Sequence, residues 1–350
     1  MEYRNLGRSG LLVSVVGLGC DNFGHRCDPK ESAAIVHRAM DLGVTFFDTA
    51  DIYGPGGLSE EYLGKALEGH RQDAVIATKF VGPTGSFTGL LHMGTSRRHI
   101  LYAVEASLRR LATDFIDLYQ VHFPYPGVPM EETLRALDDL VRQGKVRYVG
   151  CSNFSAWQLV DANWIARTQH LTPFISAQNA YNLLDRQLEK ELIPACIENG
   201  VGILPYFPLA SGFLSGKYRP GQTKPPGARL ANARPSTEPL TGVDDAIVRQ
   251  VNAELLRWVT PESVFTAENF DLLAKLEAFA TARSHTILDL AIGWLISQPG
   301  VSSVLVGASR PEQIGQNTNA ADWRLTPEEL AEVNEISACS LYLKPVPKFV

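Results

Sequence analysis

The chain has 350 residues, of which 45% are hydrophobic and 20% charged, and its formal net charge is −6 at pH 7. This composition excludes disordered and collagen-like chains and supplies enough apolar side chains for a large core. The acidic balance argues against a nucleic-acid-binding protein, which would usually carry a basic excess. At roughly 150 residues per domain the length suggests about two domains, a prior that barrel folds often break.

Two other classes are disfavoured by what the sequence lacks. The N-terminus has no hydrophobic signal core, and the longest apolar runs, such as Leu11–Val16, fall far short of the roughly 20 residues of a membrane-spanning helix. The five cysteines are Cys20, Cys27, Cys151, Cys196 and Cys339. They form no CxxC pair and have no regular spacing, which indicates neither a disulfide framework nor a zinc site. We therefore expect a cytoplasmic protein that binds no metal, membrane or nucleic acid.

The chain opens with two short β-rich segments, Tyr3–Leu6 and Leu11–Val13, around Gly7-Arg8-Ser9-Gly10, and this pattern predicts a β-hairpin. Eight further β-rich runs follow, most of them continuously apolar, as strands buried on both faces should be. They are Val15–Cys20, Val44–Asp48, Val75–Lys79, Phe115–His122, Val146–Gly150, Phe174–Gln178, Val201–Tyr206 and Ser302–Gly307.

Amphipathic segments with helix start signals separate these runs. Asp28 followed by Pro29 is a helix cap with proline at the first helical position, and Ser155 and Thr326 begin capping boxes. Other helices are predicted at Glu60–Leu67, Arg97–Leu111, Glu131–Arg142, Arg186–Glu198 and Glu268–Ala282.

The alternation of strands and helices predicts parallel strands with right-handed crossovers. An open doubly wound sheet usually carries a GxGxxG fingerprint after its first strand, and Gly17-Leu18-Gly19 does not complete one. Eight strand–helix units instead favour a closed barrel. We predict a single (β/α)8 TIM barrel spanning residues 1–350, with the hairpin at the bottom and long loops at the active-site end.

One interval, from Tyr206 to Ser302, is much longer than the others and includes the proline-rich stretch Lys224-Pro225-Pro226-Gly227. Long loops in compact domains are usually functional, and those that follow a barrel strand lie at the active-site end. We therefore predict a long loop insertion at residues 219–262 near the mouth of the barrel.

Four titratable residues stand at or just beyond predicted strand ends: Asp48, Tyr53, Lys79 and His122. In a barrel these ends meet on one face, where catalytic residues collect. A buried carboxylate and a buried ammonium are costly unless they pair, so we expect Asp48 and Lys79 to contact each other. An ammonium beside a phenol stabilises the phenolate, which suits Tyr53 to act as a general acid toward a developing alkoxide. His122 is placed to donate a hydrogen bond to the carbonyl oxygen.

In this order the four residues resemble the catalytic tetrad of the aldo-keto reductases, especially the branch of potassium-channel β subunits and bacterial reductases. The agreement extends over nearly the whole chain and includes Phe47-Asp48-Thr49-Ala50-Asp51-Ile52-Tyr53-Gly54, Ser59-Glu60-Glu61-Tyr62-Leu63-Gly64-Lys65-Ala66-Leu67, Asp117-Leu118-Tyr119-Gln120-Val121-His122 and Gly150-Cys151-Ser152-Asn153-Phe154. The resemblance implies hydride transfer from NADPH to an aldehyde or ketone, or the reverse oxidation of an alcohol. Since some members of the superfamily are cofactor-holding regulatory subunits with little turnover, that function is the alternative.

The resemblance also implies a set of cofactor contacts. Ser152, Asn153 and Gln178 would bind the carboxamide, and Tyr206 would stack under the nicotinamide ring. The segment after the seventh strand resembles the pyrophosphate-binding segment of the family, with Pro208, Leu209, Ser211, Gly212 and Lys217. The turn after the eighth strand resembles its adenosine site, with Gly307, Ser309, Arg310, Gln313 and Asn317. Because the fork of an arginine suits phosphate oxygens, Arg310 and Ser309 favour NADPH over NADH through its 2′-phosphate.

Aromatic side chains near the predicted mouth are expected to line an apolar substrate pocket, although for each of them packing in the core or on the surface explains the residue as well. They are Phe23, Phe80, Phe123 and Tyr125, with Phe87, His92 and Trp258 as further members. Tyr125 lies where the family often has the aspartate of a Pro-Asp-Pro turn, so the chain departs from the family pattern near the mouth.

Overall fold

Eight parallel strands form the barrel that the alternation predicts, in a computed structural model that describes residues 1–82, 93–125, 127–223, 228, 230 and 264–337. They are β3 (Val16–Gly19), β4 (Phe46–Asp48), β5 (Val75–Phe80), β6 (Ile116–Val121), β7 (Val146–Ser152), β8 (Ser176–Ala180), β9 (Gly202–Tyr206) and β10 (Val304–Gly307). Neighbours pair in parallel from β3 to β9, and β10 pairs with β3. A bridge from Ile203 to Val301 joins the remaining edges, so the barrel is nearly closed and the predicted (β/α)8 fold is confirmed.

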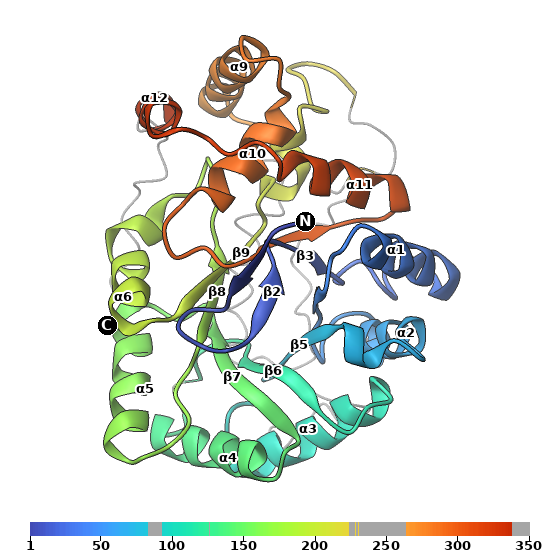
Figure 1. Ribbon diagram of the computed structural model, residues 1–350, viewed down its shortest axis with the longest axis vertical. Helices are drawn as coiled ribbons and strands as arrows, with labels where there is room; N and C mark the ends of the chain where they lie inside the picture. Colours follow the sequence, from blue (N-terminus) through green and yellow to red (C-terminus); the bar gives the residue numbers. More distant parts are fainter. Residues whose placement is uncertain (83–92, 126, 224–227, 229, 231–263, 338–350) are drawn as a thin grey trace.

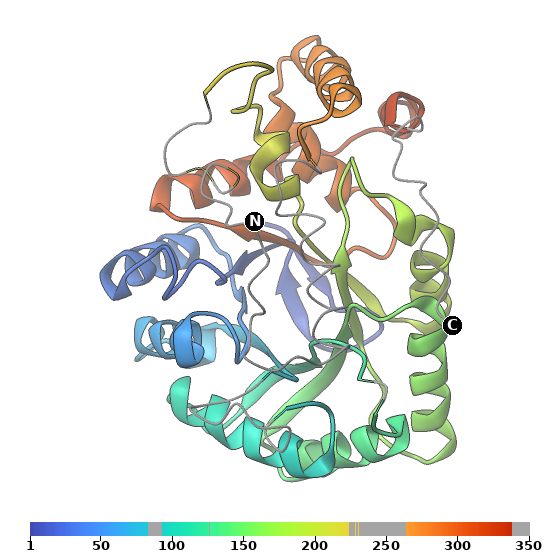
Figure 2. The ribbon, with the colours of Figure 1, turned by 180° about the vertical axis from the view of Figure 1, so that it is seen from behind.

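Helices surround the barrel as an outer ring (Figures 1 and 2). They are α1 (Pro29–Asp41), α2 (Leu58–Ala66), α3 (Arg97–Arg110), α4 (Met130–Arg142), α5 (Ala156–Thr168), α6 (Leu192–Asn199), α9 (Ala267–Thr281), α10 (Ile287–Ile296), α11 (Pro311–Ala320) and α12 (Pro327–Ser337). The start signal of α1 acts as predicted: Asp28 accepts a hydrogen bond from the Glu31 amide, and Glu31 accepts one from the Asp28 amide. Among the described helices, none is both long and apolar enough to cross a bilayer.

The helix predicted over Arg186–Glu198 is wrong in its first half. The structure has a short 3-10 helix, η4 (Gln187–Lys190), and then α6. Glu191 between them has φ −139°, outside the helical range. Pro194 explains the break, since it has no backbone N–H to donate to the Lys190 carbonyl and so cannot continue a helix through this turn.

The N-terminal hairpin closes the lower end of the barrel, as predicted. Its strands β1 (Tyr3–Asn5) and β2 (Leu12–Ser14) are antiparallel and cross the middle of the ring of helices in Figure 1. The turn lies against the start of β9, where the Arg8 amide donates to the Gly200 carbonyl at 2.8 Å. Gly7 has φ +59°, and a Cβ there would lie 2.4 Å from the Gly200 oxygen, so this contact requires glycine. The hairpin contributes to a core inside the barrel that comprises Leu6, Val13, Phe46, Ala77, Leu118, Leu204 and Leu305.

A cluster of buried polar side chains lies between β5 and the helices outside it. Glu60 of α2 is fully buried, receives the guanidinium of Arg110 at 2.6 Å and accepts a hydrogen bond from Thr78 at 2.5 Å. Asp51 is 3% exposed, and neither of its carboxyl oxygens makes a hydrogen bond of ordinary geometry. Burial and the nearby Glu60 raise the pKa of Asp51 well above its usual range, against smaller opposing effects of Arg110, the Val81 amide and Lys79. Burial therefore favours the neutral, protonated form of the Asp51 carboxyl.

This assignment predicts that Asp51→Asn stabilises the protein at pH 7 and has little effect near pH 4. Below about pH 3.9, the pKa of an aspartate in the unfolded chain, the Asp51 carboxyl is protonated in both the folded and the unfolded protein. Above it only the folded protein holds this proton, so folding becomes less favourable as pH rises. Each unit by which the folded pKa exceeds the unfolded one costs about 1.4 kcal/mol at neutral pH, and the asparagine removes this cost.

Urea unfolding of wild type and Asp51→Asn at pH 4 and pH 7 measures the difference. Asp161→Asn, at an exposed position on α5, is the matched control and should show no such pH dependence. A variant that is less stable than wild type by the same amount at both pH values would contradict the neutral Asp51.

Candidate active site

The four predicted catalytic residues come together at the carboxyl end of the barrel. Asp48 is the last residue of β4, Lys79 precedes the last residue of β5, and His122 directly follows β6. Tyr53 lies in the turn after β4, where its amide donates to the Ala50 carbonyl and its own carbonyl accepts from the Ser59 amide. Parallel neighbouring strands therefore bring residues from three separate segments to one edge.

The ammonium of Lys79 is the centre of the group. Its Nζ atom donates to Asp48 Oδ2 at 2.6 Å, to the Thr49 carbonyl at 3.0 Å and to the Tyr53 hydroxyl at 3.3 Å. Lys79 is fully buried and Asp48 is 3% exposed. Because an ammonium has three hydrogens, these three acceptors satisfy it completely. The expected contact between Asp48 and Lys79 is present.

The second carboxylate oxygen of Asp48 has donors of its own. Oδ1 accepts from Gln178 Nε2 at 2.7 Å and from Gln120 Nε2 at 3.4 Å. Gln120, a fully buried residue of β6, is not among the residues predicted for the site. Strand alternation is the signal for it, since Leu118, Gln120 and His122 follow one another at every second position and face the barrel interior.

His122 is a neutral imidazole beside the tyrosine. It is 5% exposed, stacks on Phe123 with ring centroids 4.4 Å apart, and meets Tyr53 edge-on at 5.8 Å. Burial, with a smaller effect of Lys79, lowers the pKa of His122 well below its usual range. Its Nδ1 atom has no hydrogen-bond partner among the described residues. A neutral ring retains one N–H that can donate to a ligand oxygen.

The residues expected to bind the carboxamide lie next to this group and are joined to one another. Asn153 Nδ2 donates to the His122 carbonyl at 3.0 Å and to Ser152 Oγ at 3.1 Å, and Ser152 Oγ donates to the Gln178 carbonyl at 2.9 Å. The Tyr206 hydroxyl donates to Asn153 Oδ1 at 2.7 Å. The ends of β6, β7, β8 and β9 are thus connected through side chains.

The segment after β9 has an unusual backbone. In η5 (Ala210–Ser215), Ala210, Ser211 and Gly212 all have positive φ, at 45°, 58° and 90°. The φ of Gly212 favours glycine, and the exposed Lys217 lies over this backbone, with its Nζ 2.7 Å from where a Cβ would stand. Of the other two residues expected in this segment, Pro208 is buried and Leu209 half-buried.

The turn after β10 carries the remaining predicted cofactor residues. Gly307 ends β10, and Arg310 is the exposed N-cap of α11 with no side-chain capping bond. Gln313 Oε1 accepts from the amide of Ser309 at 2.7 Å and from its hydroxyl at 3.2 Å, which fixes the turn. Asn317 is buried on α11.

The aromatic residues expected in the substrate pocket divide into two pairs. Phe123 stacks on His122, and Tyr125 packs over Gly94, so both lie on the side of the tetrad. Phe23 and Phe80 are fully buried in the core between the barrel and the helices. Phe80 lies there because it points outward from β5, while its neighbour Lys79 points inward. The structure therefore does not bring Phe23 and Phe80 to the pocket. Phe87, His92 and Trp258 lie outside the described residues.

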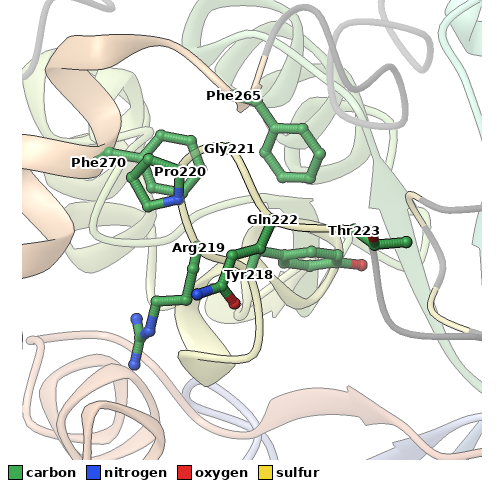
Figure 3. A pocket seen from close by; sticks show the side chains of 8 residues that line it. All are labelled: Tyr218, Arg219, Pro220, Gly221, Gln222, Thr223, Phe265 and Phe270. Carbon is green, nitrogen blue, oxygen red and sulfur yellow. The ribbon is translucent and has the colours of Figure 1, made fainter.

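Most of the predicted 219–262 insertion also lies outside the described residues. Its described start borders a cavity of about 260 Å³ beside η5 (Figure 3). The cavity lining includes no residue of the tetrad and consists of Tyr218, Arg219, Pro220, Gly221, Gln222, Thr223, Phe265 and Phe270.

Comparison with known proteins agrees with this geometry. The Aldo/keto reductase family matches residues 15–338. The chain is 35% identical to a probable voltage-gated potassium channel subunit beta of Arabidopsis thaliana, with 96% of each chain covered. It is 33% identical to L-glyceraldehyde 3-phosphate reductase of Escherichia coli K12, covering 96% of this chain and 92% of the relative, and 34% identical to versiconal hemiacetal acetate reductase of Aspergillus parasiticus, covering 96% of both. The chain belongs to the aldo/keto reductase family.

Proposed function

We propose that this protein transfers a hydride between NADPH and the carbonyl carbon of an aldehyde or ketone, or from an alcohol in the reverse direction. Tyr53 acts as the general acid or base, assisted by Lys79, Asp48 and His122. The observation that carries the proposal is the position of the Lys79 ammonium, which donates to Asp48 at 2.6 Å and to the Tyr53 hydroxyl at 3.3 Å at the same time.

Each member of the tetrad has a defined task. Asp48 holds the Lys79 ammonium beside the Tyr53 hydroxyl. An ammonium next to a phenol stabilises the phenolate, so Tyr53 is suited to give its proton to a developing alkoxide. His122, as a neutral imidazole, donates a hydrogen bond to the carbonyl oxygen and orients it. In the oxidation direction the same Tyr53 oxygen accepts the proton.

Several features of the mouth suit a dinucleotide. The left-handed backbone from Ala210 to Gly212 forms a cradle for a pyrophosphate, and Lys217 lies over Gly212. A Cβ at residue 212 would occupy part of this space. Arg310 at the start of α11 presents an exposed guanidinium fork at a helix N-terminus, which suits the 2′-phosphate of NADPH. When bound, NADPH would supply the hydride, and its nicotinamide end would be held by Ser152, Asn153, Gln178 and Tyr206.

A second candidate function is that of a cofactor-holding regulatory subunit with little turnover. It is favoured by the similarity to a relative named as a potassium channel subunit. The complete tetrad favours the enzyme, since a subunit that only holds a cofactor needs no proton donor.

The substitution Tyr53→Phe keeps the ring and removes the proton donor. We expect NADPH-dependent reduction of a panel of aldehydes and ketones to fall by about 10²–10⁴-fold, the usual contribution of general acid catalysis, while NADPH binding is unchanged. Steady-state NADPH oxidation measures turnover, and quenching of tryptophan fluorescence measures binding. Tyr102→Phe on the exposed face of α3 is the matched control. Equal turnover in Tyr53→Phe and wild type would overturn the catalytic proposal, and NADPH binding without turnover in wild type would support the regulatory one.

The substitution Arg310→Ala tests the preference for NADPH over NADH. We expect Arg310→Ala to raise the Kd of NADPH by about 10-fold or more and that of NADH by less than about 3-fold, because a charge-assisted contact to the 2′-phosphate is lost only with NADPH. Fluorescence titration with each cofactor tests this, with Arg109→Ala at an exposed position on α3 as the control. Equal weakening of both cofactors would exclude a 2′-phosphate role for Arg310.

A further inference from the structure

Two buried hydroxyl groups close the base of the Tyr53 turn, the segment of residues 49–59. Thr49 directly follows β4, Ser59 is the second residue of α2, and both are fully buried. Their side-chain oxygens lie 2.8 Å apart and form a hydrogen bond. Tyr53 lies between them in the chain. The bond therefore joins the two ends of the segment that carries the phenol.

The direction of this hydrogen bond follows from the second partner of Ser59. Because a carbonyl only accepts, Ser59 Oγ donates its single hydrogen to the backbone carbonyl of Cys20, at 2.8 Å. The Thr49 hydroxyl must then be the donor to Ser59 Oγ. Two hydrogen bonds thus run from the end of β4 through the start of α2 to Cys20, which directly follows β3. Each bond in such a chain strengthens its neighbour.

The backbones of the same two residues contact the tetrad. The Thr49 carbonyl accepts from Lys79 Nζ at 3.0 Å, and the Ser59 amide donates to the Tyr53 carbonyl at 3.0 Å. The N-cap of α2, Gly57, makes no side-chain capping bond, so the amides at the start of this helix depend on other partners. A displacement of Ser59 therefore moves the backbone of Tyr53, and a displacement of Thr49 moves an acceptor of Lys79.

We propose that Thr49 and Ser59 are positioning residues, whose hydroxyl–hydroxyl bond holds the Tyr53 phenol within reach of the Lys79 ammonium. This inference rests on the proposed function, in which Tyr53 gives its proton to the substrate. Both hydroxyls are fully buried and bonded within the protein, so they act through Tyr53 and not on the substrate.

The contact that this bond protects has little margin. Of the three hydrogen bonds of Lys79 Nζ, the one to the Tyr53 hydroxyl is the longest, at 3.3 Å against 2.6 and 3.0 Å. A side-chain hydrogen bond is lost by about 3.6 Å, so a shift of a few tenths of an ångström in the Tyr53 turn is enough to break it. Catalysis is sensitive to such shifts, since a misplacement of about 1 Å can cost about 100-fold in rate.

Thr49→Val is the variant that tests the bond. It replaces the hydroxyl with a methyl group of similar size and keeps the backbone carbonyl that binds Lys79. Thr49→Ser restores the hydroxyl without the methyl group. Thr172→Val is the matched control, because Thr172 Oγ1 also donates one hydrogen bond, to Asp138 at 2.8 Å, but lies before β8 at the opposite end of the barrel. The readouts are kcat and KM for 4-nitrobenzaldehyde at saturating NADPH, the Kd of NADPH and the melting temperature.

We expect Thr49→Val to lower kcat by about 10-fold, while KM and the Kd of NADPH change by less than about 3-fold, because the bond acts on proton transfer and not on binding. Thr49→Ser should keep at least about half of the wild-type kcat. Thr172→Val should keep the wild-type kcat even where its melting temperature falls as far as that of Thr49→Val. A kcat of Thr49→Val within about 2-fold of wild type, or a Thr49→Ser variant as slow as Thr49→Val, would disprove the positioning role.

Ser59→Ala tests the same bond from its other end and does not depend on the folding of Thr49→Val. It removes this bond together with the one to Cys20, and should also lower kcat with little change in KM. Because the shared bond is then already absent, adding Thr49→Val should slow the Ser59→Ala enzyme no further. A wild-type kcat in Ser59→Ala, or two effects that multiply, would contradict the proposal. Failure of the proposed function has a separate signature, which is equal turnover of Tyr53→Phe and wild type.

Discussion

The site depends on one constraint, the full satisfaction of a buried ammonium. Lys79 is completely removed from solvent, and a charge in that position is tolerated only where acceptors surround it. Asp48, the Thr49 carbonyl and the Tyr53 hydroxyl supply three acceptors for its three hydrogens. All three belong to β4 and the turn after it, the neighbour of β5 in the barrel. The adjacency of two strands therefore fixes where the phenol of Tyr53 lies.

The same requirement extends outward from Asp48. Its second oxygen binds the amides of Gln178 and Gln120, and the backbone carbonyl of Gln178 in turn accepts from Ser152. Gln178, which is expected to contact the cofactor, thus also holds the Asp48 carboxylate that binds Lys79. This layer of polar side chains lies above the apolar core that Leu118 and Leu204 form with the hairpin. The apolar layer fills the barrel, and the polar layer above it holds the Lys79 ammonium beside the Tyr53 hydroxyl.

The barrel, and the meeting of four residues from its strand ends, are predictable because each has a local signal. Apolar runs marked the eight strands, and strand ends marked Asp48, Lys79 and His122. Features that depend on tertiary packing were not predictable in this way. The helix α10 (Ile287–Ile296) is almost entirely buried and apolar, so it shows no amphipathic period and was missed. The core position of Phe80 needed the inward or outward sense of β5, which the neighbouring Lys79 would have supplied through alternation.

Asp48 and Asp51 are three residues apart, and their positions give the two carboxyl groups different partners and a different tendency to hold a proton. Asp48 faces the barrel interior and receives Lys79, whereas Asp51 faces the cluster outside β5, where Arg110 is already bound by Glu60. With every hydrogen of Lys79 and the charge of Arg110 committed elsewhere, burial outweighs the Val81 amide and raises the pKa of Asp51, which favours its neutral form. A charged Asp51 would add a second carboxylate near Lys79 and weaken the effect of the ammonium on Tyr53. In the proposed mechanism, a neutral Asp51 therefore leaves Asp48 as the single carboxylate that opposes the action of the Lys79 charge on the phenol.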